Sequence, residues 1–130
     1  MEEGRIPPHN SEAESATLGA ILLDGEALGR VLTLIRPDDF YHRANRFIYE
    51  AILALSDRNE DVDLLTLTNE LQSENNLEQV GGAGYVSSLT SRVPASTNVE
   101  YYARMVQQAS LRRRLIRISQ EIVGDSYDSS

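Results

Sequence analysis

Apolar residues recur at spacings of three and four along most of this chain, the pattern of helices that bury one face. The clearest case is the set at i, i+3, i+4 and i+7 formed by Leu28, Val31, Leu32 and Ile35. No segment of five or more residues shows the strict alternation of a half-buried strand. The pattern therefore predicts an all-α fold, a small bundle of about six helices around residues 13–22, 28–35, 47–55, 64–71, 85–89 and 99–123.

Local signals predict where several of these helices begin and end. Residues 11–14 have the form S-x-x-E, a capping box that would open the first helix. Pro37 ends the second helix, and Asp63 is the expected N-cap of the fourth. Residues 97–100 form a second capping box, which opens the longest helix, and this helix is expected to end near Val123.

Two glycine features need an explanation. Gly19 lies inside the first predicted helix, where glycine costs up to ~1 kcal/mol relative to alanine. We therefore expect a close contact with another helix at this position. The cluster at residues 81–84 resembles a phosphate-binding turn, but it lacks the lysine of a phosphate loop and follows no clear strand. A sharp turn between two helices is the better interpretation.

The same signals divide the chain into four parts. Residues 1–10 form an extended N-terminal arm, because each proline of Ile6-Pro7-Pro8 disfavours helix in the residue before it. Residues 11–95 form a globular helical subdomain, and residues 96–123 form the long helix. Residues 124–130 are polar and begin with glycine, so they are expected to be a linker.

Composition excludes several kinds of chemistry. The 130 residues contain no lysine and no cysteine, and all 12 basic residues are arginine. A Schiff-base lysine, a complete phosphate loop, a thiol nucleophile and a cysteine-based zinc site are therefore all excluded. His9 and His42 are the only histidines and are isolated in sequence, which makes a histidine metal site improbable.

Charge is unevenly distributed along the chain. The net charge is -8, but residues 1–80 hold 16 acidic and 6 basic side chains, whereas residues 81–130 hold 4 acidic and 6 basic ones. An acidic body repels phosphate, so DNA binding by this chain alone is expected to be weak or absent. The longest apolar run, residues 20–23, is far too short to cross a membrane, and the acidic N-terminus has no secretory signal. A cytoplasmic location is the default expectation.

Two acidic clusters could carry chemistry. Asp57, Glu60, Asp61 and Asp63 could bind a divalent cation, although their spacing does not match a calcium-binding loop. A solvated turn with an N-cap is the better interpretation. Residues 38–42 place Asp38 and Asp39 near His42, but no nucleophile is placed to complete an acid–base group. Helix capping and a surface histidine are preferred here.

The last helix carries two apolar stripes instead of one. The first stripe has steps of 4, 3 and 4 and consists of Leu111, Leu115, Ile118 and Ile122. The second stripe begins at Tyr101 and ends at Ile116. A helix with two apolar faces must pack on two sides or present one of them to a partner. It could be central to its own bundle, or it could form a helix–helix interface flanked by arginines that pair with acidic neighbours.

A series of short motifs then becomes recognisable in its order. They are Ile6-Pro7-Pro8, Glu12-Ala13-Glu14, Leu18-Gly19, Pro37-Asp38-Asp39-Phe40-Tyr41, Val62-Asp63, Leu65-Thr66-Leu67, Val80-Gly81-Gly82 with Tyr85, Val93-Pro94, Asn98-Val99-Glu100-Tyr101-Tyr102-Ala103 and Arg113-Arg114-Leu115-Ile116. Together they resemble the N-terminal domain of the bacterial replicative DNA helicases of the DnaB type. One departure is Asn45, where the family usually has a histidine, and it puts a local hydrogen bond in doubt.

The resemblance implies a non-catalytic fragment of a ring-shaped helicase that unwinds DNA at the bacterial replication fork. ATP and Mg would belong to a RecA-like motor domain absent from this chain, so no catalytic, cofactor-binding or metal-binding residues are assigned. The family's N-terminal domain is a helical globule followed by a helical hairpin, and the long helix here would be the hairpin's first arm. Hairpins pair into dimers, and a trimer of dimers forms a collar. The collar receives the helicase-binding domain at the C-terminus of primase and, in some members, a helicase loader.

The resemblance also suggests which residues make these contacts. The expected protein-interaction residues are Tyr85, Leu111, Arg113, Arg114, Leu115, Ile116, Ile118 and Ile122. Within this set, Tyr85, Ile116 and Ile122 are expected to face primase, with the arginines secondary. Two alternatives stay open at this point: a free-standing acidic all-α adaptor, and a small metal-dependent hydrolase that uses the acidic cluster at residues 57–63.

Overall fold

A computed structural model describes residues 5–94 and 98–128 of the chain. This part contains six α-helices, two short 3-10 helices and no strand, which confirms the all-α prediction. The elements are α1 (Ser11–Leu23), α2 (Ala27–Val31), η1 (Pro37–Asp39), α3 (Arg43–Asp57), α4 (Leu64–Ser73), α5 (Gly82–Ser88), η2 (Leu89–Arg92) and α6 (Val99–Tyr127).

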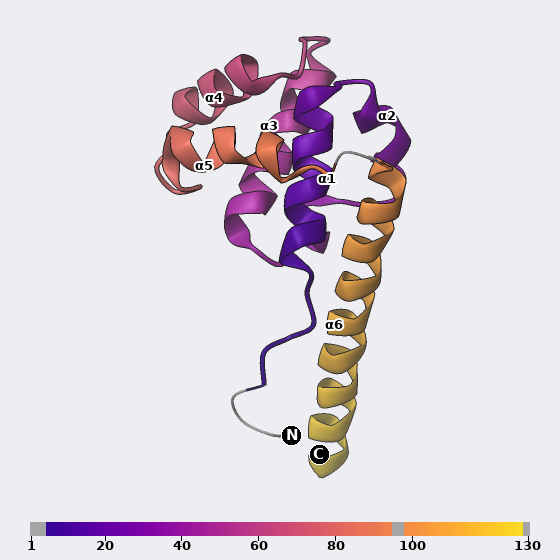
Figure 1. The fold of residues 1–130 in the computed structure, drawn as a ribbon. Coiled ribbons are helices and arrows are strands. Elements are labelled where there is room, and N and C mark those ends of the chain that lie inside the picture. The colour runs from indigo at the N-terminus through magenta and orange to yellow at the C-terminus, as the bar shows by residue number, and fades with distance from the viewer. Residues whose placement is uncertain (1–4, 95–97, 129–130) are drawn as a thin grey trace.

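Helix α1 is the centre of the globule. It packs against α6, η2, α3 and α2, and Figure 1 shows it between the α4–α5 pair and α6. Its residues from Ala13 to Leu22 are all buried, as expected for a helix that is covered on every side. The large aliphatic side chains of α1, α3 and α4 fill the core, and each contributes roughly 1.5–3 kcal/mol by leaving water.

The start of α1 differs from the predicted capping box. The N-cap is Asn10, whose Oδ1 accepts a hydrogen bond from the backbone N–H of Ala13 at 2.9 Å. Glu14 is only 1% exposed and does not turn back to cap the helix. Its carboxylate instead accepts from the backbone N–H of Tyr41 at 2.6 Å, because the segment that enters α3 offers unpaired donors there.

The second helix is shorter than its apolar pattern predicted. Helix α2 ends at Val31, and the chain continues as a turn before Pro37. Leu28, Val31 and Ile35 are buried as expected, whereas Leu32 is 45% exposed. The periodicity therefore predicted the buried positions better than it predicted the length of the helix.

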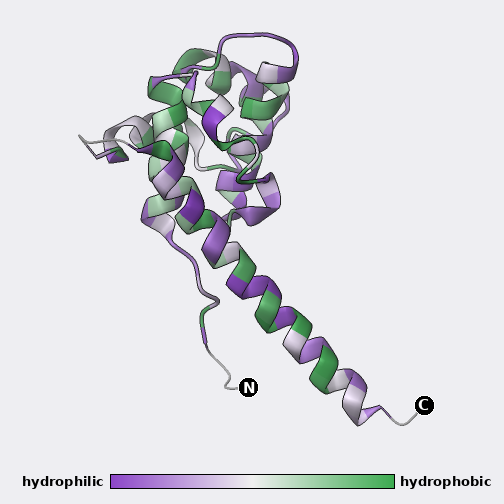
Figure 2. Ribbon diagram, turned by 90° about the vertical axis from the view of Figure 1, so that its right-hand side faces the viewer, coloured by the Kyte–Doolittle hydropathy of each residue, from purple (hydrophilic) through white to green (hydrophobic). Residues whose placement is uncertain are grey.

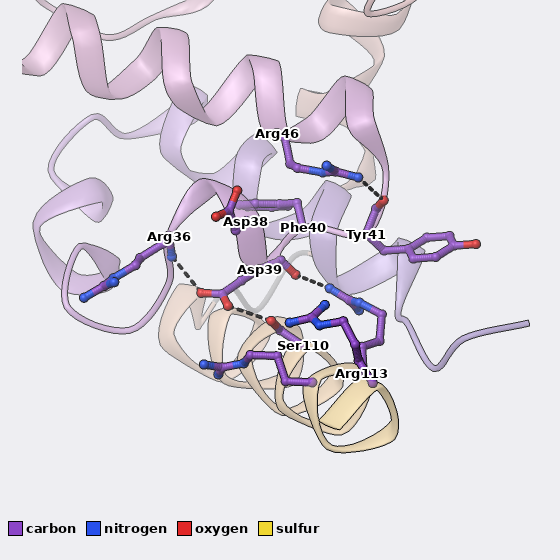
Figure 3. A pocket seen from close by; sticks show the side chains of 10 residues that line it. Arg36, Asp38, Asp39, Phe40, Tyr41, Arg46, Ser110 and Arg113 are labelled. Carbon is purple, nitrogen blue, oxygen red and sulfur yellow. Dashed lines mark hydrogen bonds between the residues drawn. The ribbon is translucent and has the colours of Figure 1, made fainter. Parts of the chain in front are cut away.

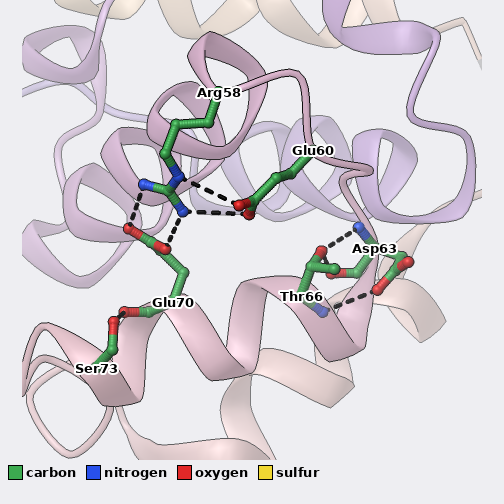
Figure 4. Close-up of polar contacts among 6 residues, drawn as sticks. All are labelled: Arg58, Glu60, Asp63, Thr66, Glu70 and Ser73. Carbon is green, nitrogen blue, oxygen red and sulfur yellow. Dashed lines mark hydrogen bonds and ion pairs between the residues drawn. The ribbon is translucent and has the colours of Figure 1, made fainter.

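The predicted N-cap of α4 is present, whereas the N-cap of α6 lies one residue after the predicted position. The Asp63 carboxylate accepts from the backbone N–H of Thr66 at 2.9 Å, and the Thr66 hydroxyl accepts from the backbone N–H of Asp63 (Figure 4). Asn98 caps α6 through a hydrogen bond from the Tyr101 N–H at 3.2 Å. Thr97, which the predicted capping box places first, lies outside the described residues.

Both glycine predictions hold. A Cβ atom at Gly19 would lie 2.2 Å from the carbonyl oxygen of Leu89, so α1 and η2 approach each other through this position. Gly81 and Gly82 have φ angles of +106° and +78°, which side chains other than glycine rarely adopt. They turn the chain sharply into α5.

Helix α6 is the longest element and projects from the globule (Figures 1 and 2). Its buried residues lie between Val99 and Ser110. It ends at Tyr127, four residues beyond the predicted end, and so includes the start of the predicted linker. One glycine, Gly124, costs only about 1 kcal/mol in a helix and does not break it. No helix in the described residues is long and apolar enough to cross a membrane.

Candidate functional site

The projecting half of α6 carries the first predicted apolar stripe on an uncovered surface. Leu111, Leu115, Ile118 and Ile122 are each between 48% and 60% exposed. Green and purple positions alternate along this part of the helix in Figure 2. The interpretation that the whole helix is central to its own bundle is therefore wrong for this half, because the globule covers none of the stripe.

A different face of α6 holds the helix to the globule. It begins with Val99, Ala103 and Val106, which are buried, and continues through Ser110 to the half-buried Arg113. These steps of four, three, four and three trace one face of an α-helix. The apolar contact therefore ends at Ser110, and the helix projects from that point.

Arg113 is engaged within its own chain. Its Nη1 donates to the carbonyl oxygen of Pro8 at 3.0 Å and its Nη2 to that of Asp39 at 2.7 Å. Its guanidinium also lies over the Tyr41 ring, 5.5 Å from the ring centre. The predicted pairing of flanking arginines with acidic side chains is wrong for Arg113, which binds carbonyl oxygens. Arg114, the next residue, is exposed.

Tyr85 does not lie with the isoleucines that were expected to share its surface. It is on α5, which Figure 1 places on the globule, well away from the projecting half of α6 that carries Ile116 and Ile122. Its hydroxyl donates to Oδ1 of Asn45 at 2.6 Å, and the Arg92 guanidinium lies 5.8 Å from its ring centre. The single surface predicted for these three residues is thus two separate surfaces.

A buried polar network connects Tyr85 to α1, and the sequence did not reveal it. Nδ2 of Asn45 donates to Glu14 at 2.9 Å while Oδ1 of Asn45 accepts from Tyr85. Asn45 and Glu14 are each only 1% exposed. Asn45, the departure from the family pattern, is therefore hydrogen-bonded and supplies both a donor and an acceptor. The available signal for Glu14 was a charged residue on the same helix face as Leu18, four positions later.

The N-terminal arm lies beside α6. A groove of about 700 Å³ separates them and is lined by Ile6, Pro7 and Pro8 on the arm and by Ile116 and Arg117 on the helix. The arm is also attached to the globule, since the His9 ring stacks on Tyr41 with 4.1 Å between ring centres. Ile116 is thereby placed on a different side of α6 from the exposed stripe.

Members of the acidic cluster at residues 57–63 form structural contacts instead of a shared site. Arg58 bridges Glu60 and Glu70 on the surface, and Asp63 caps α4 (Figure 4). Among residues 5–94 and 98–128, no group of three histidine, aspartate or glutamate side chains could hold a metal ion.

Asp39 and His42 also have hydrogen-bond partners within the fold. The Asp39 carboxylate accepts from the Arg36 backbone N–H at 2.8 Å and from the Ser110 hydroxyl at 2.7 Å. The ring of His42 is hydrogen-bonded to the Ser11 hydroxyl at 2.7 Å, and within the described residues it makes no hydrogen bond to Asp38 or Asp39. The preferred interpretation as helix capping agrees with the position of Asp39 in η1.

Comparison with known proteins decides among the remaining possibilities. Residues 6–108 match the sequence model of the DnaB-like helicase N terminal domain. The chain belongs to this family. The DnaB-like family match ends where α6 leaves the globule, so the best-matched part is the folded body and the start of the long helix. Membership favours the helicase interpretation over an adaptor or a hydrolase.

Individual members of the DnaB-like family agree in sequence and in fold. The replicative DNA helicase DnaB of Geobacillus stearothermophilus is 48% identical over 123 residues, which are 95% of this chain and 27% of that protein. The crystal structure of the N-terminal domain of DnaB helicase from Mycobacterium tuberculosis superposes with a TM-score of 0.91 at 39% identity, over 95% of this chain and 90% of that one. This chain spans about a quarter of the length of its full-length helicase relative.

A further structure, of a DnaB-like replicative helicase and its interactions with primase, superposes with a TM-score of 0.78 at 27% identity. The match covers 89% of this chain and 27% of that one. The observed arrangement of helices is therefore the fold of the DnaB-like N-terminal domain, as the resemblance implied.

Proposed function

We propose that this chain is the assembly and partner-docking domain of a bacterial replicative DNA helicase, and that it has no catalytic role itself. The uncovered apolar stripe on the projecting half of α6 carries this proposal. In the parent protein, a separate motor domain would bind ATP and Mg and unwind DNA at the fork, in the cytoplasm.

The form of the stripe indicates what covers it. Large aliphatic residues at steps of 4, 3 and 4 form the narrow seam used when one helix packs along another. Each of these side chains gains roughly 1.5–3 kcal/mol when it is fully buried, so the stripe favours association. The proposed occupants are the second arm of the hairpin and the hairpin of a neighbouring subunit. Pairing of this kind gives a dimer and, in the full hexamer, a trimer of dimers.

Partner docking is proposed for the second surface, on the globule. A helicase similar to this chain has been studied structurally with primase. The contact on this chain would receive the helicase-binding domain at the C-terminus of primase, and in some members a loader. Tyr85 on α5 belongs to this surface, whereas Ile122 is part of the self-association stripe and Ile116 lies on the groove side of α6.

Sedimentation velocity on the 130-residue chain tests the self-association part. We expect a concentration-dependent dimer that Ile118→Asp combined with Ile122→Asp abolishes. The matched control is Ser119→Asp combined with Ser126→Asp, which adds the same two negative charges at exposed positions of the same helix outside the stripe. A wild-type chain that stays monomeric at all concentrations, or equal loss in the control, would contradict the proposal.

A pull-down with the C-terminal domain of the cognate primase tests the docking part. Binding should survive the two α6 substitutions and weaken with Tyr85→Ala, provided that thermal unfolding shows the variant to be folded. Loss of binding with the α6 variant and not with Tyr85→Ala would instead place primase on α6.

A further inference from the structure

A cavity of about 460 Å³ lies at the junction between the globule and α6. Figure 3 shows the turn at residues 38–41 and α3 forming one wall and α6 forming the other. The α6 residues that line it begin with Ser110 and Arg113. The cavity is therefore on the face of α6 that points to the globule, away from the apolar stripe.

The walls of this cavity are strongly positive. Five of the chain's 12 arginines line it, and only two carboxylates, Asp38 and Asp39, oppose them; the arginines are Arg36, Arg46, Arg113, Arg114 and Arg117. The surplus is three positive charges in a chain whose net charge is -8. A recess lined by one sign of charge concentrates counter-ions of the opposite sign.

The two carboxylates leave this surplus uncompensated. Both oxygens of Asp39 are used, one by the Arg36 backbone N–H and the other by the Ser110 hydroxyl. Among the described residues, none of the five arginines forms an ion pair within 4 Å, since the pairs found there belong to Arg58. The guanidinium groups of Arg114 and Arg117 make no hydrogen bond within the described part of the chain and extend from an exposed stretch of α6.

Two arginines in the wall are partly withdrawn from water. The Nε of Arg46 is buried and has no hydrogen-bond partner among the described residues, while its Nη2 donates to the Tyr41 carbonyl at 3.2 Å. Burial lowers the pKa of Arg113, although the nearby carboxylates of Glu14 and Asp39 act in the opposite direction. A buried cation gains most from an added anion, because the anion replaces interactions lost with water.

We propose that this cavity binds a compact polyphosphate anion, a free di- or triphosphate that Arg46, Arg114 and Arg117 hold. Guanidinium groups match phosphate oxygens with paired, charge-assisted hydrogen bonds. One phosphate monoester carries only about −1.5 to −2 charges at pH 7, so a surplus of three is better matched by two or more linked phosphates. The volume lies within the roughly 300–1,000 Å³ of small-molecule sites.

The surroundings favour a small anion over a nucleic-acid backbone. A strand leaving the cavity would cross the acidic body, because residues 1–80 carry 16 acidic side chains against 6 basic ones. Single-stranded binding also uses open aromatic faces for base stacking. Tyr41 is covered by His9 and Arg113, and Phe40 is only 1% exposed, so neither ring is open to a base.

Isothermal titration calorimetry of the 130-residue chain with inorganic pyrophosphate tests the site. The titration is done at low ionic strength, where exposed charges are least screened. We expect one binding event that Arg114→Gln combined with Arg117→Gln weakens at least roughly tenfold, since each removed charge-assisted hydrogen bond has that effect. The matched control is Arg104→Gln combined with Arg112→Gln, which removes two exposed arginines of the same helix outside the cavity.

A further variant and a second ligand distinguish the possible outcomes of this titration. Asp38→Asn should tighten pyrophosphate binding, because it removes an opposing charge from the wall without removing a donor. Absence of binding by the wild-type chain, or equal weakening by the control with Arg104→Gln and Arg112→Gln, overturns the site. A thymidine oligonucleotide that binds through Arg114 and Arg117 when pyrophosphate does not would assign the cavity to nucleic acid and overturn the proposal as stated. The outcome is separate from that of the docking proposal, because the docking test uses Tyr85, which does not line the cavity.

Discussion

Gly19 of α1 and Leu89 of η2 are in contact through their backbones, and a Cβ atom at position 19 would lie 2.2 Å from the Leu89 carbonyl oxygen and 2.6 Å from a methyl carbon of Val93. The obstacle is a main-chain atom, so it cannot rotate aside as a side chain would. This contact fixes how closely the segment after α5 packs on the central helix, and with it the position of the α4–α5 side of the globule.

Gly19→Ala should therefore destabilise the domain by roughly 2 kcal/mol or more, the usual range for forced overpacking. The gain in helix propensity, up to ~1 kcal/mol, offsets only part of this cost. Urea unfolding measures the change. The control is Gly29→Ala in α2, where nothing lies within 4 Å of the added atom, so stability should be unchanged or slightly higher. Equal effects at the two positions would refute the close contact.

Glu14→Gln should cost about 2 kcal/mol, although the two side chains have nearly the same shape. The carboxylate accepts hydrogen bonds from the Tyr41 backbone N–H and from Asn45, and the amide nitrogen of glutamine would face one of these donors. Glu12→Gln, at an exposed position of the same helix, is the control and should have little effect. Chemical denaturation gives the free energy of unfolding of both variants. An unchanged free energy of unfolding in Glu14→Gln would show that the charge of Glu14 is not needed.

Tyr49 predicts how stability changes at alkaline pH. Burial, with a smaller contribution from Asp39, raises the pKa of its phenol to about 12 from an ordinary value of 10.0. The folded state therefore holds this proton more tightly than the unfolded state. The stabilisation from Tyr49 is fully present below the pKa that its phenol has in the unfolded state. It is lost as the pH rises from that value through the pKa of the phenol in the folded state.

Denaturation midpoints measured from about pH 9 to about pH 11 should consequently fall with pH, and the fall should be smaller in Tyr49→Phe. Tyr127→Phe is the matched control, because it removes the same hydroxyl from a side chain that is 86% exposed. An unchanged slope in Tyr49→Phe would contradict the assignment.

The projecting part of α6 should be the least protected helix of the isolated chain. Its residues beyond Arg113 are exposed, and a helical segment of this length is marginal in water without tertiary packing. Hydrogen exchange should be fast there in dilute solution and slower as the concentration rises and the stripe is covered. Gly124→Ala should raise helicity by circular dichroism. Strong protection of this segment in a verified monomer would show that the stripe needs no partner.

Local patterns in the sequence predicted the helices and the positions of the apolar stripe on α6. Asp63 caps α4 because an N-cap depends on residues three positions away, and such signals are visible in a short window. Glu14 was misassigned for the opposite reason. Its capping-box pattern is local, but the donors that capture it come from residues about 30 positions along the chain.

The grouping of site residues could not be predicted in the same way. Tyr85 and Ile116 lie on separate surfaces because the globule's packing, and not the spacing of residues, decides where α5 lies relative to α6. The cavity between Arg46 and Arg117 likewise brings together two helices that are far apart in sequence. Only the arginine run on α6 was visible in advance.

Arg113 gives the molecule a mechanical property. One planar guanidinium joins α6 to the arm through Pro8 and to the turn before α3 through Asp39. A rotation of the long helix about its axis that is larger than the Arg113 side chain can follow would break one or both of these bonds. A force on the far end of the projecting helix therefore acts through Arg113 on the N-terminal arm as well as on the globule.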